Sequence, residues 1–229
     1  MTVEQELARV SPEKDTKLTI GVFDGVHLGH KYLIAQLKEH ARQQDLLSGV
    51  ITFRQHPDAV LSPQTRLPFL TDLATRTRLL KDEGVDIVVT LSFTRELARL
   101  SARDFVSELQ KHLRMRALLV GPDFALGQAR EGDINALRAL GQEMDFSVIM
   151  VPPVVINGEI VSSTAIRQSL AQGDMEKVAR LAGRPFSLHG RIISGAHRGA
   201  GLGFPTANID IDLNQALPAE GVYVTRAYL

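Results

Sequence analysis

Two histidines and two glycines stand close together near the start of the chain. In the segment LTIGVFDGVHLGHKYLIAQLKEHA (18–41), His27 and His30 are three residues apart and are accompanied by Gly25 and Gly29. The glycines permit positive φ angles and a close approach of the backbone to a ligand. The first N–H groups of the helix expected to follow are unpaired, and the helix dipole is positive there, so this corner suits a phosphate. Each imidazole would add an N–H donor to a phosphoryl oxygen.

Other interpretations of this corner stay open on spacing alone. A zinc site would need a third and a fourth ligand, and no further His/Asp/Glu cluster shows metal-ligand spacing. The chain has seven histidines, so these two could be ordinary surface residues. Glycine at a strand–helix turn also occurs for purely steric reasons, and short motifs often match by chance.

A second group of polar residues lies in EIVSSTAIRQSL (159–170). Ser162, Ser163 and Thr164 stand at an expected helix start, and Arg167 follows three residues later. Helical side chains lean toward the N-terminus, so the guanidinium of Arg167 can reach over these hydroxyls. Hydroxyls, free N–H groups and a guanidinium together suit a polyphosphate. Taken alone, this segment favours the simpler interpretation of a serine cap beside a surface arginine.

A third candidate is the loop in VGPDFALGQAREGD (120–133), which follows a short apolar strand. Asp123 could accept hydrogen bonds from a ribose or a base. The alternative is a structural turn in which Asp123 only shapes the backbone and Phe124 anchors the loop to the core.

The elements around these segments predict how they are positioned. Apolar runs with β-rich composition predict strands, and apolar residues at helical spacing with capping residues predict helices. The strands are expected at 17–23, 48–53, 86–93, 117–121 and 146–151, and the helices at 31–43, 71–84, 101–113 and 133–144. This alternation predicts an α/β fold, a doubly wound, Rossmann-like parallel sheet with helices on both faces. Ligands bind such sheets beyond the carboxyl ends of the strands, where residues 24–30 stand.

The pattern of predicted elements changes near residue 184, from helices to β segments. Before it, Ser163 or Thr164 starts a short helix that ends near Gly173, and Asp174 caps another that ends near Gly183. After it, FSLHGRIISG (186–195) and GVYVTRAYL (221–229) read as β segments around a glycine-rich loop. We therefore predict two domains, 1–183 and 184–229.

Composition excludes several classes of protein. Formal net charge is zero and the chain has no cysteine, which argues against a nucleic-acid surface and excludes disulfides, thiolate zinc sites and cysteine nucleophiles. The charged first residues are no signal peptide, and no run is apolar enough for a membrane span. We expect a soluble cytoplasmic protein that binds neither nucleic acid nor membrane, and the sequence carries no signal for its oligomeric state.

Together these segments resemble the bacterial bifunctional riboflavin kinase/FMN adenylyltransferase family, also called FAD synthetase. GVFDGVHLGH matches the family's form of the HxGH nucleotidyltransferase motif, which many other nucleotidyltransferases share. ITFRQHPDAVL resembles its flavin-side segment, GPDFALG its ribose and adenine loop, and VSSTAIR its triphosphate turn. HRGAGLGFPTANI resembles the flavokinase signature. Five segments in the same order make the resemblance specific.

The resemblance implies transfer of AMP from ATP to FMN, with riboflavin as the substrate of the kinase domain. It implies that His27, His30 and Arg167 are catalytic. The residues implied to contact ATP are Gly21, Phe23, Asp24, Gly25, Gly29, Asp123, Ser162, Ser163 and Thr164. Those implied on the flavin side are His56, Pro57 and Asp58, and those implied to hold phosphate and metal in the kinase domain are Thr206 and Asn208. Mg²⁺ is expected on phosphate oxygens and waters.

Three departures from the family pattern affect these expectations. Leu126 stands where the family usually has phenylalanine, and Ala200 where its kinase signature has arginine. The family's kinase barrel extends beyond residue 229, so we expect an incomplete barrel with exposed strand edges and little riboflavin phosphorylation, as in a fragment or truncated gene. The alternatives are a non-catalytic flavin- or nucleotide-binding relic, and another HxGH adenylyltransferase acting on phosphopantetheine or a nicotinamide mononucleotide, against which the Pro-Thr-Ala-Asn run argues.

Overall fold

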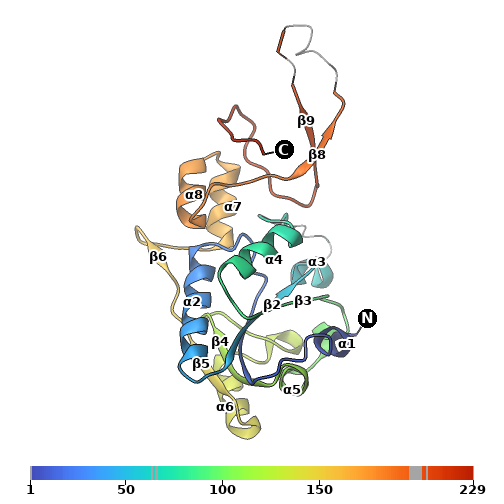
Figure 1. Ribbon diagram of the computed structural model, residues 1–229, viewed down its shortest axis with the longest axis vertical. Coiled ribbons are helices and arrows are strands. Elements are labelled where there is room, and N and C mark those ends of the chain that lie inside the picture. Colours follow the sequence, from blue (N-terminus) through green and yellow to red (C-terminus); the bar gives the residue numbers. More distant parts are fainter. Residues whose placement is uncertain (1, 63, 65–66, 196–202, 205, 229) are drawn as a thin grey trace.

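A five-stranded parallel sheet forms the centre of the protein (Figure 1). The computed structural model describes residues 2–62, 64, 67–195, 203–204 and 206–228. The strands are β1 Thr16–Ile20, β2 Leu47–Phe53, β3 Ile87–Leu91, β4 Met115–Val120 and β5 Ser147–Met150. Their order is β3-β2-β1-β4-β5, and every neighbouring pair is parallel. The predicted doubly wound α/β class is confirmed.

The strand order places a topological switch point at β1. The chain runs from β1 through β2 to β3 on one side, and β4 and β5 lie on the other side. The loops after β1 and β4 therefore leave the same edge of the sheet from neighbouring strands, which is where open parallel sheets bind ligands. The first loop carries residues 21–27 and the second carries residues 121–127.

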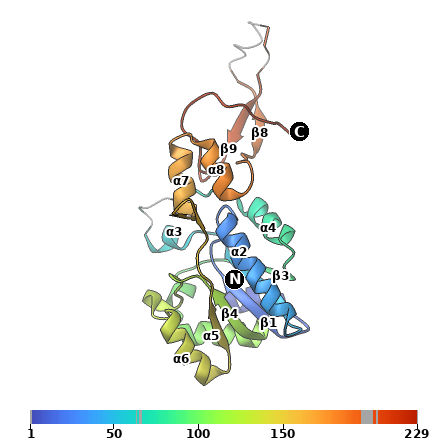
Figure 2. The same ribbon diagram turned by 90° about the vertical axis from the view of Figure 1, so that its left-hand side faces the viewer.

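Helices cover both faces of the sheet (Figures 1 and 2). The first core joins one face to α1 Val3–Leu7, α5 Ala102–Leu113 and α6 Ile134–Met144. The second core joins the other face to α2 Leu28–Arg42 and α4 Leu73–Asp82. Ile51 of β2 packs into the first core and its neighbour Val50 into the second, because successive side chains of a strand point to opposite faces.

Helix ends follow the capping residues that the sequence predicts. The side chains of Ser101 and Asp133 accept hydrogen bonds from N–H groups in the first turns of α5 and α6. Ser162 is the N-cap of α7 Ser163–Ala171, and Asp174 is the N-cap of α8 Met175–Ala182. Gly183 ends α8 in the left-handed conformation, with φ of 69°, a role that glycine takes without steric cost.

A third core lies at the carboxyl edge of the sheet. Leu70 packs there against Ile166 of α7, Leu181 of α8 and Ala216 from the last part of the chain. Residues beyond 184 therefore contribute to the same core as the helices that precede them.

The region after residue 184 contains one antiparallel hairpin in its described part. It pairs β8 Gly190–Ile193 with β9 Asn208–Ile211, which confirms the strand expected within 186–195. Thr206 and Asn208 are exposed there. Ala200 and most of the glycine-rich loop lie outside the described residues. The strand expected at 221–229 is wrong for its described residues 221–228, whose Val222 and Val224 are fully exposed, because a strand forms only where a partner strand satisfies its backbone.

Several small elements were not expected from the sequence. They are β9, α1, the short α3 Pro57–Leu61, and the hairpin of β6 Val155–Ile156 and β7 Glu159–Ile160. The turn of that hairpin is Asn157-Gly158, with φ angles of 52° and 80°, a sequence typical of tight hairpins. Short 3₁₀ turns occupy Leu97–Arg99 and Gln128–Arg130. Every helix among the described residues is too short or too polar to cross a membrane.

Candidate active site

The loop between β1 and α2 has a strained backbone. Phe23, Gly25 and Val26 all have positive φ angles, of 52°, 79° and 35°. Such angles are a genuine outlier for a β-branched residue such as Val26 and cost on the order of 1–3 kcal/mol. Phe23 and Val26 are buried in the second core, and their burial offsets the strain. The loop is thus fixed in a shape that a free chain would not hold.

Two glycines around this loop allow close approaches that a larger residue would crowd. A Cβ on Gly29 would lie 3.1 Å from the ring of His27 and 3.1 Å from the carbonyl oxygen of Val161. A Cβ on Gly25 would lie 2.9 Å from Leu70. Gly29 lets the start of α2 approach the segment before α7, so the first and second predicted constellations meet, and Gly25 lets the histidine loop approach Leu70 before α4.

His27 and His30 form a stacked pair at the start of α2. Their ring centroids are 3.6 Å apart and their planes differ by 18°. His27 is the N-cap, and its Nδ1 accepts a hydrogen bond of 3.3 Å from the backbone N–H of His30. Because Nδ1 accepts, the neutral ring carries its proton on Nε2. Nδ1 of His30 is buried and has no partner among the described residues.

Both histidines are neutral near pH 7. Burial lowers the pKa of His27 to about 4, helped by the nearby positive charges of Arg184 and Arg167. Burial also holds the pKa of His30 well below its ordinary value, and His27, Arg76 and Arg184 act in the same direction. Each ring therefore offers one N–H donor rather than a full charge.

A buried ion pair adjoins the histidine loop. The carboxylate of Asp24 accepts hydrogen bonds from the backbone N–H groups of Leu70 (2.9 Å) and Thr71 (3.2 Å) and pairs with Arg167 of α7. The Nε–H of Arg167 donates to the carbonyl oxygen of Pro68 at 3.0 Å. Arg167 thus lies against Asp24, whereas the sequence suggested that its guanidinium would lie over the hydroxyls of its own helix.

The hydroxyl residues at the start of α7 divide into different structural roles. Ser162 caps the helix by accepting a hydrogen bond from the N–H of Ala165 at 3.2 Å. Ser163 donates its hydroxyl to the carbonyl oxygen of Asp24 at 2.9 Å. Thr164 is exposed. Two of the predicted phosphate residues, Ser163 and Arg167, therefore contact the backbone and side chain of Asp24.

The loop after β2 lies near the same ion pair. His56 is the N-cap of α3, and its Nδ1 accepts from the N–H of Asp58 at 3.2 Å. Its pKa is lowered, chiefly by burial, and it is also affected by the charges of Asp24 and Arg167. Pro57 is half-buried and Asp58 is exposed. The carboxyl ends of β1 and β2 thus bring the histidine and flavin-side segments together.

Asp123 lies on the loop after β4 with its side chain exposed. Its carbonyl oxygen accepts a hydrogen bond of 2.7 Å from Arg130. Leu126 is buried in the first core and pairs with Gly132 through two backbone hydrogen bonds. The loop therefore folds back on itself, and leucine occupies the core position where the family usually has phenylalanine. Gly21 begins the loop after β1, and its N–H donates to Ile51 at 3.0 Å.

Comparisons with known proteins identify the family. The family profile of FAD synthetase matches residues 10–165, and that of riboflavin kinase matches residues 182–229. A bifunctional riboflavin kinase/FMN adenylyltransferase from Escherichia coli K12 is 39% identical, over 93% of this chain and 68% of the relative. The chain belongs to the FAD synthetase family. Proteins of the same name from Listeria monocytogenes and Pseudomonas fluorescens are 35% and 37% identical, over 91% and 98% of this chain and 67% and 72% of the relatives.

Solved structures resemble the protein at two levels. A crystal structure of a protein from Streptococcus pneumoniae, described as a macrolide-efflux protein, is 31% identical with a TM-score of 0.86, and the match covers 95% of this chain and 71% of that one. A pantoate-β-alanine ligase from Francisella tularensis is 15% identical with a TM-score of 0.50, over 79% and 75% of the two chains. The second likeness concerns the fold alone.

Arg76 of α4 lies beside the candidate site and was not predicted from the sequence. It is 1% exposed, its Nη2 donates to the carbonyl oxygen of Phe53 at 2.6 Å, and its guanidinium lies 4.7 Å from the ring centre of Phe69. Its Nε and Nη1 have no partner among the described residues. The sequence feature that could have indicated Arg76 is its helical spacing: it stands three residues before Leu79 and four before Leu80, which lie on the buried face of the helix.

Arg184 is the second missed residue, and it touches the histidine loop directly. Its Nη2 donates to the carbonyl oxygen of Gly25 at 2.6 Å and its Nη1 to that of Val26 at 3.1 Å. Nothing local to the sequence around residue 184 indicates these contacts, since they join residues about 160 positions apart.

A group of carboxylate and histidine side chains that could share a metal ion lies away from the candidate active site. Within the described part of the chain, one such group brings together Glu4 of α1 with Glu108 and His112 of α5. Spacing along the sequence does not reveal this group, because Glu4 of α1 is distant in sequence from Glu108 and His112 of α5. None of these residues is on the loops after β1, β2 or β4.

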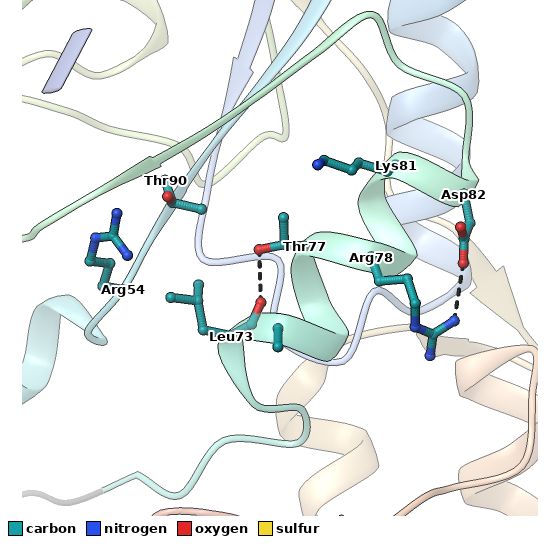
Figure 3. Close-up of a pocket in the computed structure, with 8 residues that line it drawn as sticks. Arg54, Leu73, Thr77, Arg78, Lys81, Asp82 and Thr90 are labelled. Carbon is teal, nitrogen blue, oxygen red and sulfur yellow. Dashed lines mark hydrogen bonds and ion pairs between the residues drawn. The ribbon is translucent and has the colours of Figure 1, made fainter. Parts of the chain in front are cut away.

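A groove of about 670 Å³ lies beside α4 and contains none of the predicted site residues (Figure 3). Within it, Arg78 pairs with Asp82 at 3.2 Å and the hydroxyl of Thr77 donates to the carbonyl oxygen of Leu73 at 2.7 Å. The side chains lining the groove are those of Arg54, Leu73, Ala74, Thr77, Arg78, Lys81, Asp82 and Thr90.

Proposed function

We propose that the protein transfers AMP from ATP to the phosphate of FMN, giving FAD and pyrophosphate. The observation that carries the proposal is the stacked pair of His27 and His30 at the start of α2, beside the Asp24–Arg167 ion pair. This arrangement gathers neutral N–H donors and a guanidinium at the switch point of the sheet, and nucleotidyl transfer needs both.

The chemistry explains why a general base is unnecessary. The nucleophile is a phosphate oxygen of FMN, which is already anionic because the second pKa of a phosphate monoester is about 6. It forms a bond to the α-phosphorus of ATP while the bond from that phosphorus to the β-phosphate oxygen breaks. The enzyme must bring two anions together and hold the charge that grows on the oxygens, which is a matter of position and electrostatics.

Neutral imidazoles and backbone amides are suited to the α-phosphate. His27 offers Nε2–H, and His30 offers a second ring donor. The backbone N–H of His30 is used by the cap. In the described part of the chain the N–H groups of Leu28 and Gly29 have no partner, so these amides are available to a phosphoryl oxygen. Donors that are fixed before the reaction stabilise its transition state without reorganisation.

Arg167 and the start of α7 are proposed to hold the β- and γ-phosphates. Two of the three guanidinium nitrogens of Arg167 bind Asp24 and Pro68, and Nη1 has no partner among the described residues. Nη1 can therefore contact phosphate while the other contacts stay in place. Ser162, Ser163 and Thr164 would add hydroxyl and amide donors.

The remaining assignments complete the proposal. Asp123 contacts the nucleoside, and His56, Pro57 and Asp58 line the flavin side. Mg²⁺ would arrive on the triphosphate, since the carboxylate of Asp24 is engaged by Arg167 and by backbone N–H groups. We assign residues 1–183 to the transferase and 184–229, with Thr206 and Asn208, to the kinase region, and we infer that the enzyme works in the cytoplasm.

One assay tests the function. The purified chain is incubated with FMN, ATP and Mg²⁺, and FAD and pyrophosphate are measured by chromatography; equal amounts of the two products are expected. FMN binding without FAD would instead support a non-catalytic flavin-binding protein. Riboflavin in place of FMN tests the kinase in the same assay, because FAD then forms only if riboflavin is phosphorylated first.

A further inference from the structure

Arg184 lies near the start of the region matched to riboflavin kinases, residues 182–229, and holds the loop that carries the histidines. Its two terminal nitrogens donate to the carbonyl oxygens of Gly25 and Val26, at 2.6 and 3.1 Å. These are the two peptide groups that precede His27, and both residues have positive φ angles. A planar guanidinium presents a rigid fork of donors that can hold two consecutive carbonyls at once, whereas the ammonium of a lysine is a point charge on a flexible stem without that fixed geometry.

A second set of contacts from the same region supports the backbone that binds Asp24. The N–H of Phe69 donates to the carbonyl oxygen of Asn214, and the N–H of Ala216 donates to that of Phe69, both at 2.7 Å. The two residues that follow Phe69, Leu70 and Thr71, donate their N–H groups to the carboxylate of Asp24. The segment around Asn214 therefore holds the backbone of residues 69–71 in place, and this backbone in turn binds the carboxylate of Asp24.

The chain around these contacts is packed rather than loosely attached. Gln215 and Ala216 are buried, and the side chain of Gln215 donates to the carbonyl oxygen of Ser187 at 3.2 Å. The N–H of Ala219 donates to the carbonyl oxygen of Leu170 in α7 at 3.0 Å. In both views the chain after β9 returns toward α7 and α8, while the hairpin of β8 and β9 extends away (Figures 1 and 2).

We propose that Arg184 is a positioning residue for adenylyl transfer, and that Arg184 and residues 214–219 form part of the scaffold of the transferase site. Arg184 acts through the carbonyls of Gly25 and Val26 on the position of His27, and residues 214–216 act through Phe69 on Asp24 and Arg167. The inference rests on the proposed function for its kinetic test. It makes the region matched to riboflavin kinases necessary for FAD formation, whether or not that region phosphorylates riboflavin.

The test compares variants of the full chain with a matched control. Arg184→Met removes both donors, Arg184→Lys keeps the charge without the fork, and Arg180→Met removes an exposed arginine from α8. A displacement of about 1 Å in a catalytic group can cost on the order of 10² in rate. We expect kcat for FAD formation to fall by about that factor in Arg184→Met and by less in Arg184→Lys, with little change in KM for ATP or FMN. Arg180→Met should match the wild type.

Two further measurements separate positioning from loss of folding. Methylguanidinium added to Arg184→Met should restore part of kcat, because it can occupy the vacated site. Ala216→Pro removes the N–H that donates to Phe69 and should also lower kcat, with a thermal melt to confirm folding. If Arg184→Met does not fold, Arg184→Lys decides the question.

The inference is overturned if folded Arg184→Met, or failing that folded Arg184→Lys, has a kcat within threefold of the wild type. Absence of FAD from the wild-type chain would refute the proposed function instead. In that case NMR of the histidine rings tests the positioning alone: Arg184→Met should shift the His27 and His30 signals while Arg180→Met leaves them in place, and unchanged signals in Arg184→Met would end the proposal.

Discussion

Replacing His27 with asparagine would test whether the histidine pair is held neutral by its burial. Asparagine is a good N-cap and can still accept the hydrogen bond from the N–H of His30, but it does not titrate in this pH range. The variant therefore keeps the start of α2 and removes one ionisable group. Any difference in pH dependence between the two proteins can then be assigned to the ring of His27 and its effect on His30.

The size of the effect follows from the pKa of His27. In the folded protein it is about 4, compared with about 6.5 for an unperturbed histidine. A difference of about 2.5 units corresponds to roughly 3 kcal/mol. Because the folded pKa is depressed, this stability is fully present above pH 6.5 and is lost as the pH falls toward 4, where the unfolded chain binds a proton that the folded chain rejects.

Urea unfolding at several values between pH 8 and pH 4.5 measures this difference. The free energy of unfolding of the wild type minus that of His27→Asn should be constant above pH 7 and should fall by 2 kcal/mol or more by pH 4.5, as an order of magnitude. Other titrating groups cancel in the subtraction if they are distant from residue 27. Parallel pH curves for the two proteins would refute the reasoning, since they would mean that His27 ionises as it does in the unfolded chain.

The remaining predictions concern turnover and binding. His30→Ala should lower kcat for FAD formation by on the order of 10²–10³ with the fold retained, the usual loss for one such donor; a kcat within a few-fold of the wild type would remove the residue from the mechanism. Arg167→Ala should mainly raise KM for ATP, measured in steady state at saturating FMN, and an unchanged KM would cancel its assignment to the triphosphate. Gly29→Ala should lower kcat or stability, because its Cβ would press on the His27 ring and on Val161; a fully active and equally stable variant would show that this close approach is unnecessary.

Local rules predicted the parts of the fold that depend on neighbouring residues. Ser101, Asp133 and Asp174 begin helices because their side chains accept hydrogen bonds from N–H groups three positions later in the chain. The parallel strands were visible as short apolar runs because they are buried on both faces. The same logic placed the histidine loop at the carboxyl edge, because β1 ends directly before it.

Contacts between distant segments could not be predicted in this way. The segment 221–228 has the composition of a strand but lacks a partner among the described residues, while Asn208–Ile211 pairs with β8. Arg167 was assigned to phosphate from its spacing, yet its partner Asp24 lies 143 residues away. The roles of Arg184 and Arg76 could not be predicted from the sequence, because they depend on the carbonyl groups and aromatic rings that surround each arginine in the folded protein.

The most direct test of the account is a crystal structure of the protein with FMN, Mg²⁺ and an ATP analogue whose α–β bridge cannot be cleaved. The account predicts the α-phosphate within hydrogen-bond distance of ring nitrogens of His27 and His30 and of the amides of Leu28 and Gly29, with the phosphate of FMN facing it. An α-phosphate bound away from both imidazoles would contradict the central claim.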